Sequence, residues 1–191
     1  MRATGAEGAL SLEKLLNQQR FHLEMVQVLI RHGDRTPAIF IPNVGNKNYD
    51  YDCTFKTADY EHKQMFDEYT QTIRHITPRE FVRGVRTVYH LLPSWQRCQF
   101  SQLTQKGFLQ HFALGKHMRT AYSSLIDKDI KSSDLHVRST ERTRCVQSAA
   151  AFLYGLLTKD AIMSGKTTLQ ISISYNSSSL SAPAEAYFVL S

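Results

Sequence analysis

Hydrophobic positions along the 191-residue chain fall into short apolar runs that alternate with helical stripes. Residues 24–30 are short, β-branched and nearly continuously apolar, which predicts a strand covered on both faces, as in a parallel sheet. Apolar residues spaced three to four positions apart predict helices over 104–122 and 140–157. Short apolar patterns at 135–138 and 169–175 predict two further strands. Strands that alternate with helices indicate an α/β architecture.

Each of the two predicted helices has an expected apolar side. For the first helix the apolar residues are Phe108, Leu109, Phe112 and Ala113, and the residues that face water are Gln105, Lys106, Lys116 and Arg119. For the second helix the apolar residues are Val146, Ala149, Ala150, Leu153 and Leu157. Ser139 or Thr140 is the expected N-cap of the second helix, because a short hydroxyl side chain accepts a hydrogen bond from a free N–H group of the first turn.

The remaining segments carry weaker signals. We expect residues 1–20 to form a loosely ordered lead-in and residues 21–191 to belong to one domain. Residues 38–100 are rich in turn-forming residues and show only weak helical patterns, at 66–76 and 81–92. Because so long a stretch without strong elements is usually functional or inserted, we expect a cap-like insertion there.

The composition, with 42% hydrophobic and 21% charged residues, is that of a globular protein. The formal net charge of +6 favours anionic partners, although a solvated basic surface explains it more simply. Nucleic acid is not an expected partner, because the chain has no run of five Lys or Arg and no aromatic-basic signature. No apolar run is long enough for a membrane span, and residues 1–20 lack the apolar core of a targeting signal.

The three cysteines are too few and too scattered for a zinc site or a disulfide scaffold. Cys53 and Cys98 lie in irregular, polar stretches and can pair if the compartment is oxidising, and three free thiols are the alternative. Cys145 lies within a helical pattern and is expected to be a small buried residue. Asn176 begins an Asn-Ser-Ser triplet, a possible glycosylation site of a kind that also arises by chance.

A cluster of cationic residues follows the first predicted strand, in the run RHGDRTP at residues 31–37. Arg31 and Arg35 carry permanently charged guanidinium groups, which match the oxygens of a phosphate in pairs. His32 lies between them, and an imidazole can attack phosphorus and hold the phosphoryl group covalently. A lone Arg-His-Gly occurs by chance, but this longer run at the end of a strand predicts a phosphate site.

A second cationic cluster, VRSTERTR at residues 137–144, joins a predicted strand to a predicted helix. A helix N-terminus offers free N–H groups and a favourable dipole to an anion. Arg144 lies one turn into the expected helix and can reach back toward the strand ends. Arg138 and Arg142 are alternatively surface charges, and we expect this of Arg142.

Together these motifs resemble the histidine acid phosphatases, branch two of the histidine phosphatase superfamily. The loop at 31–37 is similar to the family's Arg-His-Gly-x-Arg-x-Pro pattern, residues 102–115 to its helix entry, and residues 138–144 to its second arginine segment. The resemblance runs from about residue 21 to 157. It implies a phosphoglycerate mutase-like three-layer sandwich with a mainly parallel sheet, of which the chain is the N-terminal portion without the later strands.

The resemblance also implies a metal-independent phosphomonoesterase that needs no cofactor. His32 would be the nucleophile and Arg31, Arg35 and Arg144 would bind the phosphoryl oxygens, whereas Asp34 and Thr36 have no expected role. Runs at 52–54, 98–105 and 150–157 look most like the 2-phosphoxylose phosphatase subfamily. That likeness implies a phosphorylated glycan as substrate, in the glycosaminoglycan-protein linkage region, and a Golgi lumen in which a bond between Cys53 and Cys98 is more plausible.

The chain departs from the family in one important respect. The family's proton donor is a late His-Asp dipeptide, and none of the eight histidines here precedes Asp. Two other functions therefore stay open: a phosphatase for another class, such as inositol phosphates or lysophosphatidate, and a non-catalytic module that binds phosphorylated or sulfated glycans. A phosphoglycerate mutase-type transferase shares the Arg-His-Gly core, but the rest of both arginine segments argues against it.

Overall fold

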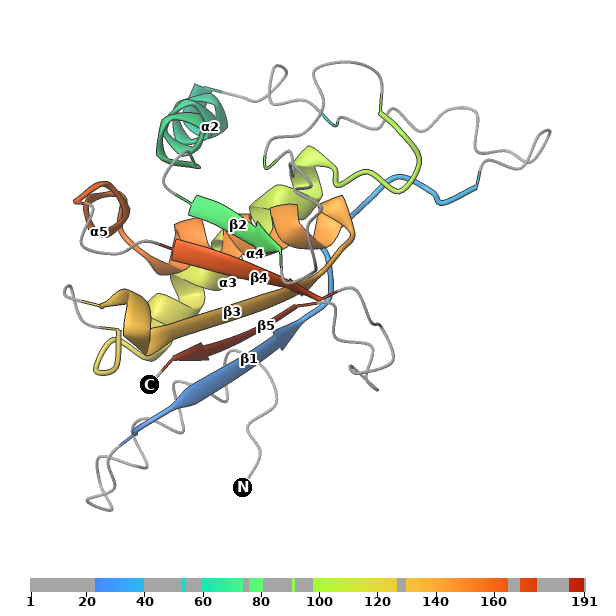
Figure 1. The fold of residues 1–191 in the computed structure, drawn as a ribbon. Helices are drawn as coiled ribbons and strands as arrows, with labels where there is room; N and C mark the ends of the chain where they lie inside the picture. Colours follow the sequence, from blue (N-terminus) through green and yellow to red (C-terminus); the bar gives the residue numbers. More distant parts are fainter. Residues whose placement is uncertain are drawn as a thin grey trace.

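A computed structural model describes residues 23–39, 53, 60–73, 76–80, 91, 98–126, 130–164, 169–174 and 186–190 (Figure 1). The elements, in chain order, are β1 (Val26–Ile30), α2 (Tyr60–Thr72), β2 (Ile76–Glu80), α3 (Gln105–Ala121), a 3-10 turn (Ser132–Asp134), β3 (Leu135–Thr140), α4 (Thr143–Leu156), α5 (Lys159–Met163), β4 (Leu169–Ser174) and β5 (Ala186–Leu190). The expected lead-in at 1–20, the weak helix at 81–92 (apart from Leu91) and Asn176 lie outside the described residues, and the domain boundaries stay predictions.

The five described strands form one sheet in the order β1-β5-β3-β4-β2. β5 is antiparallel to both of its neighbours, whereas β3, β4 and β2 are mutually parallel, so β1 runs in the same direction as β3. The mainly parallel α/β sheet is confirmed, with β5 as the one reversed strand among those described. Ile30 and Ser139 both pair with Ala186, so β1 and β3 end at the same level of the sheet.

β1 lies at the edge of the sheet, and only one of its faces is buried. Val26 and Ile30 are buried, whereas Gln27 is exposed and Leu29 is 60% exposed. The expectation that this strand is covered on both faces is therefore wrong. The described helices α3 and α4 lie together on one side of the sheet (Figure 1), so the described residues supply two of the three expected layers.

α4 is the central helix of the core. Every residue from Cys145 to Leu156 is buried, because the sheet covers one side of the helix and α3 covers the other. The predicted apolar side therefore accounts for only part of its buried surface. α4 also begins at Thr143 and not at 140, with Arg142 as N-cap, because the ladder of β3 continues to Thr140. The predicted cap at Ser139 or Thr140 is wrong.

α3 begins and ends almost where the pattern predicts. Thr104 caps it, and the Oγ1 atom of Thr104 accepts a hydrogen bond from the N–H of Gly107 at 3.1 Å. Phe108 is buried as expected, but Ala113 is exposed and Gly115 is buried instead. The helix contacts α4 at Gly115, where an added Cβ would lie 2.2 Å from the carbonyl oxygen of Phe152. The buried side of α3 therefore lies opposite Ala113.

The stretch at 38–100 contains two elements that its sequence scarcely signals. In α2, Phe66 and Tyr69 are buried and pack edge-on against Phe108 of α3, with ring centroids 5.2 and 4.5 Å apart. Ile76 begins β2, so the weak helical pattern at 66–76 is right for its first part and wrong for its end. Within the described part of the chain, no helix is both long and apolar enough to span a bilayer.

Candidate active site

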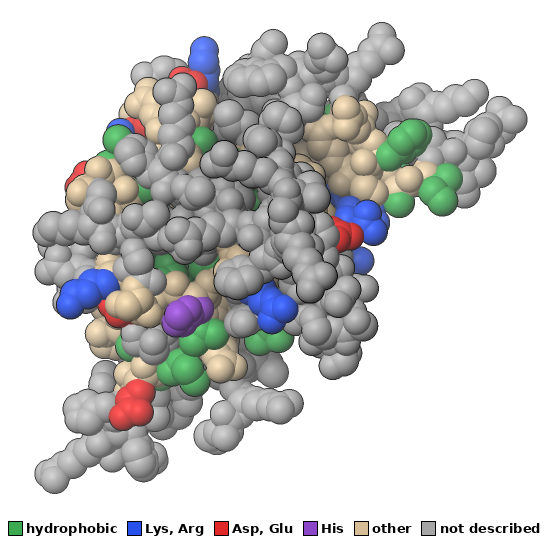
Figure 2. Space-filling model, viewed as in Figure 1, with side chains coloured by type: hydrophobic (Ala, Val, Ile, Leu, Met, Phe, Trp, Pro, Cys, Tyr) green, Lys and Arg blue, Asp and Glu red, His purple; other side chains and the backbone are tan. Residues whose placement is uncertain are grey.

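The two cationic segments, residues 31–37 and 137–144, lie at the end of the sheet where β1 and β3 terminate. β1 and β3 end level with each other, so the loop at 31–37 begins beside the residues that lead into α4. The N–H of Gly33 donates to the Oγ atom of Ser148 at 3.1 Å. Ser148 lies one helical turn after Arg144 on the same side of α4, so this side faces the loop. Figure 2 shows basic side chains at this end of the sheet.

The ring of His32 is held in one orientation by two contacts. Its Nδ1 atom lies 2.7 Å from the carbonyl oxygen of Gly33, and because a carbonyl only accepts, Nδ1 carries the proton. Nε2 then carries the lone pair, and it accepts a hydrogen bond of 3.3 Å from the Nε–H of Arg35. The lone pair of Nε2 thus points to the guanidinium group of Arg35. An anion bound by Arg35 would therefore lie close to Nε2.

The candidate arginines differ in their surroundings. Arg35 is partly buried and is fixed by a 2.8 Å hydrogen bond from its Nη1 atom to the carbonyl of Thr36. Arg144 is partly buried in the first turn of α4, whereas Arg31 and Arg142 are exposed. The expectation that Arg142 is a surface residue is confirmed. Arg35 contacts His32 directly, through its Nε–H.

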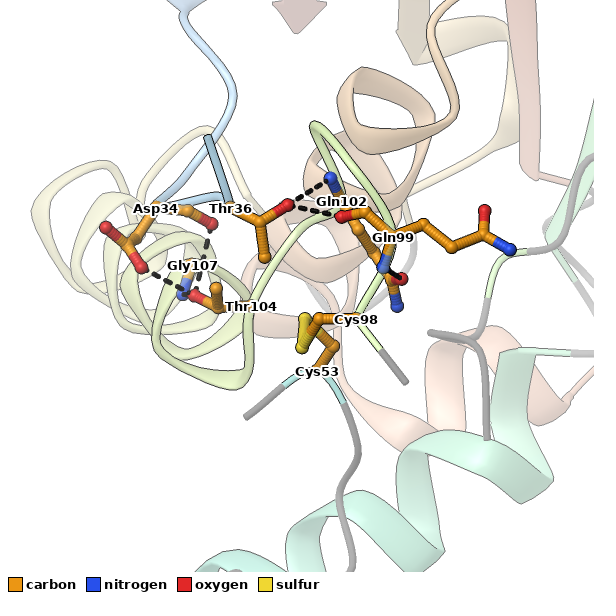
Figure 3. The surroundings of a disulfide bond; sticks show 8 residues. All are labelled: Asp34, Thr36, Cys53, Cys98, Gln99, Gln102, Thr104 and Gly107. Carbon is orange, nitrogen blue, oxygen red and sulfur yellow. Dashed lines mark hydrogen bonds between the residues drawn. A yellow bond between two sulfur atoms is a disulfide. The ribbon is translucent and has the colours of Figure 1, made fainter. Parts of the chain in front are cut away.

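Asp34 and Thr36, to which the sequence assigned no role, fasten the loop to the N-terminus of α3 (Figure 3). The carboxylate of Asp34 accepts a 2.7 Å hydrogen bond from the hydroxyl of Thr104, and its carbonyl accepts one of 3.0 Å from the Thr104 N–H. Thr36 is fully buried, donates to the carbonyl of Gln99 and accepts from the N–H of Gln102 at 2.9 Å. Residues 34–36 and 99–104 therefore form one hydrogen-bonded unit.

Two glycines allow this unit to close. A Cβ atom on Gly33 would lie 2.3 Å from the carbonyl oxygen of Gly107, and a Cβ atom on Gly107 would lie 2.2 Å from the carbonyl oxygen of Asp34. Real Cβ atoms do not approach backbone so closely. The loop and the first turn of α3 can therefore touch only because both positions lack a side chain.

A disulfide joins Cys53 to Cys98, with their Cα atoms 5.4 Å apart (Figure 3). Cys98 precedes Gln99, whose carbonyl accepts the hydrogen bond of Thr36. The bond thus fastens the segment that holds the candidate loop to a distant part of the chain. Cys145 is buried and takes no part in the disulfide, as its helical pattern predicts.

The contacts of Thr36 lead to a stability prediction. Thr36→Val keeps the shape of the side chain but removes its hydrogen bonds to the Gln99 carbonyl and the Gln102 N–H, two groups that are otherwise joined by a long 3.4 Å bond to each other. We expect a loss of about 1–3 kcal/mol in the free energy of unfolding, because two hydrogen bonds of about 0.5–1.5 kcal/mol each are lost. Thermal unfolding followed by circular dichroism measures this. Thr120→Val, at an exposed threonine of α3, is the control, and equal stability of the two variants would contradict the assigned contacts.

Comparison with known proteins now decides the family. The model for the histidine phosphatase superfamily (branch 2) matches residues 22–184. The chain belongs to this superfamily. The family match extends beyond residue 157, where the sequence motifs end, so the expected limit of the resemblance is corrected. The superfamily match includes β4, which the motifs at 31–37, 102–115 and 138–144 do not reach.

Several curated proteins are similar to this histidine phosphatase chain. Human 2-phosphoxylose phosphatase 1 is 30% identical over 140 residues, which are 72% of the chain and 28% of the human protein. Prostatic acid phosphatase of cattle is 38% identical over 69 residues, 36% of the chain and 18% of that protein. Counting factor 60 of Dictyostelium discoideum is 30% identical over 162 residues, 78% of the chain and 36% of that protein. The chain thus spans less than a third of the human relative. No solved structure matches it.

Proposed function

We propose that the chain carries the nucleophile and the phosphate-binding arginines of a phosphomonoesterase that works through a phosphohistidine. The observation that carries this proposal is the state of His32. Its Nδ1–H is fixed on the Gly33 carbonyl, so the lone pair of Nε2 points to Arg35 and becomes the nucleophile once it releases the Arg35 Nε–H. Nε2 attacks phosphorus, the bond from phosphorus to the ester oxygen breaks, and the leaving oxygen takes up a proton. Water then cleaves the P–N bond and releases inorganic phosphate.

The arginines supply the electrostatic part of this reaction. The transferring phosphoryl group keeps negative charge on three oxygens, and fixed cations stabilise that charge without reorganisation. The bond of Arg35 to the Thr36 carbonyl and the position of Arg144 one turn before Ser148 support these roles. In this proposal the exposed Arg31 side chain closes over the bound phosphate. Neither a metal nor a cofactor has a step in this reaction.

The leaving group determines how fast this chain can turn over. No histidine in the sequence precedes an aspartate, so the family's proton donor has no counterpart here. General-acid help contributes about 10²–10⁴-fold to such a step. An alkyl or sugar alkoxide needs that proton, whereas a nitrophenolate leaves without one. We therefore expect this chain to release aryl phosphates far faster than sugar phosphates.

For the substrate we propose a 2-phosphoxylose residue in the linkage region between glycosaminoglycan and protein, in the Golgi lumen or another part of the secretory pathway. The support is the similarity to 2-phosphoxylose phosphatase 1 over 72% of the chain. The disulfide between Cys53 and Cys98 fits an oxidising compartment. The similarity to prostatic acid phosphatase keeps a phosphatase for other esters, such as inositol phosphates or lysophosphatidate, as the alternative.

The experiment compares substrates on one purified protein. The 191-residue chain is assayed with 4-nitrophenyl phosphate, a 2-phosphoxylose-containing linkage oligosaccharide, an inositol phosphate and lysophosphatidate. We expect the aryl phosphate to turn over fastest and, among the natural esters, the phosphoxylose substrate to have the highest kcat/KM. A preference for either of the other two natural esters would refute the substrate assignment and leave the phosphatase assignment standing.

A second candidate function is the binding of phosphorylated or sulfated glycans without hydrolysis. The cationic segments at residues 31–37 and 137–144 favour it, because arginines can bind such anions whether or not a proton donor is present. This function predicts that the chain binds such glycans but does not release phosphate even from 4-nitrophenyl phosphate. Measurable release of phosphate from the aryl ester would rule it out.

A further inference from the structure

A buried histidine on α3 lies behind the strand end that leads to His32. His111 is 5% exposed, although most histidines lie at least partly in water. It follows Gly107 by one helical turn, so both residues lie on the side of α3 that contacts the loop at 31–37. His111 therefore faces the backbone that carries His32 and belongs to none of the contacts described so far.

His111 makes a hydrogen bond to the backbone of Arg31. A carbonyl only accepts, so a ring N–H of His111 is the donor. The Nδ1 atom is buried and has no hydrogen-bond partner in the part of the chain that the structure describes, which assigns the N–H to Nε2. The pKa of His111 is lowered to about 4, mainly by burial and to a smaller extent by the neighbouring His32, although the bond to Arg31 raises it, so the ring is a neutral donor at ordinary pH.

This bond acts on the peptide that precedes His32. Arg31 is the first residue beyond β1, so its carbonyl lies outside the hydrogen-bond ladder of the sheet. His111 of α3 holds that carbonyl, and Ser148 of α4 holds the N–H of Gly33 on the other side of His32. The backbone on both sides of His32 is therefore fixed, and with it the direction in which the imidazole leaves the chain.

We propose that His111 is a positioning residue for His32: its Nε2–H holds the Arg31 carbonyl so that the Nε2 atom of His32 points at the bound phosphorus. This inference rests on the function proposed above. The site requires a donor that is buried and uncharged. A lysine would place a positive charge beside His32, and an aliphatic residue would leave the carbonyl without its donor.

Four variants separate positioning from packing. His111→Leu removes the donor, and we expect kcat for 4-nitrophenyl phosphate to fall by roughly 10²-fold, the effect of about 1 Å of misplacement, with KM changed little because the arginines remain. His111→Gln keeps an N–H near the position of Nε2 and should recover most of kcat. His111→Asn ends near Nδ1 and should not. His117→Gln, elsewhere on α3, should behave as the unchanged protein.

A readout that does not depend on turnover keeps the inference separate from the proposed function. Histidine side chains labelled with ¹⁵N report which ring nitrogen carries the proton. We expect His32 to be in the Nδ1–H form in the unchanged protein and in His111→Gln, and in a mixture of tautomers in His111→Leu. If the unchanged protein releases no phosphate, the proposed function fails, and the spectra alone decide the role of His111.

Two results would overturn the inference. One is that His111→Leu leaves both kcat and the His32 spectrum unchanged. The other is that His111→Gln and His111→Asn have equal effects on both readouts. This comparison can be made even if His111→Leu does not fold.

Discussion

His32→Ala is expected to lower the turnover of 4-nitrophenyl phosphate by about 10⁴-fold or more, because the change removes the atom that we propose accepts the phosphoryl group. The arginines do not change, so inorganic phosphate or vanadate should still bind, with at most a modest loss of affinity. The same variant should take up no label from a ³²P-labelled aryl phosphate. In the unchanged protein the label should be acid-labile and stable to base, as a phosphohistidine is.

The control for this variant is His136→Ala. His136 is an exposed histidine of β3 on the sheet face that α4 does not cover, and it makes no contact with the loop among the described residues. We expect it to retain full turnover and full labelling. Labelling that persists in His32→Ala, or that is lost equally in His136→Ala, would remove His32 as the nucleophile. Loss of anion binding in His32→Ala would indicate instead that the ring holds the site together.

The local part of the site is predictable from the sequence, because it lies within seven consecutive residues. His32 and Arg35 are three positions apart on one loop, so a short run that follows a strand already places them together. The extent of the helix at 105–121 is equally local, since the apolar spacing within a few turns predicts it to within one residue at each end, although not all of its buried side. These features depend on neighbours in the chain, and patterns between neighbours are what a single sequence reveals.

The contacts that hold the loop could not be predicted in this way. Asp34 and Thr36 bind residues 99–104, which are more than sixty positions away, and most of the partner atoms belong to the backbone. Because nearly every residue has the same backbone carbonyl and N–H groups, the sequence does not show which of them form these hydrogen bonds. His111 is similar: its burial beside Arg31 depends on how α3 packs on the strand end, and the helical stripe alone does not distinguish it from a surface histidine.

Tertiary pairing also decided where several elements begin and end. Ser139 and Thr140 have the residue types of an N-cap, but pairing with β4 and β5 keeps them in a strand. β2 contains Pro78, which disfavours a central strand, and it is tolerated because β2 lies at the sheet edge. β5 comes from a five-residue apolar run, and such a run does not by itself distinguish a strand from a buried helix or reveal its direction.

Gly107→Ala is expected to damage both stability and activity, because it adds one methyl group where none fits. The new Cβ would lie 2.2 Å from the carbonyl oxygen of Asp34 and 2.7 Å from its nitrogen, so α3 and the loop must separate. Overpacking of this kind costs up to about 3 kcal/mol, and the better helix propensity of alanine returns about 1 kcal/mol. The net loss of about 2 kcal/mol corresponds to roughly 4–8 °C in Tm for a protein of this size.

Activity should fall more steeply than stability in Gly107→Ala, which is why both are measured. Separating the loop from α3 stretches the bonds of Thr104 to Asp34 and moves His32 relative to Ser148, and a shift of about 1 Å costs about 10²-fold in rate. The control is Ala113→Gly, at an exposed position of the same helix, which should lose about 1 kcal/mol from propensity alone and keep its kcat. If Gly107→Ala melts no lower than Ala113→Gly and retains full kcat, the loop at 31–37 does not rest on α3. The orientation of His32 must then be maintained from elsewhere.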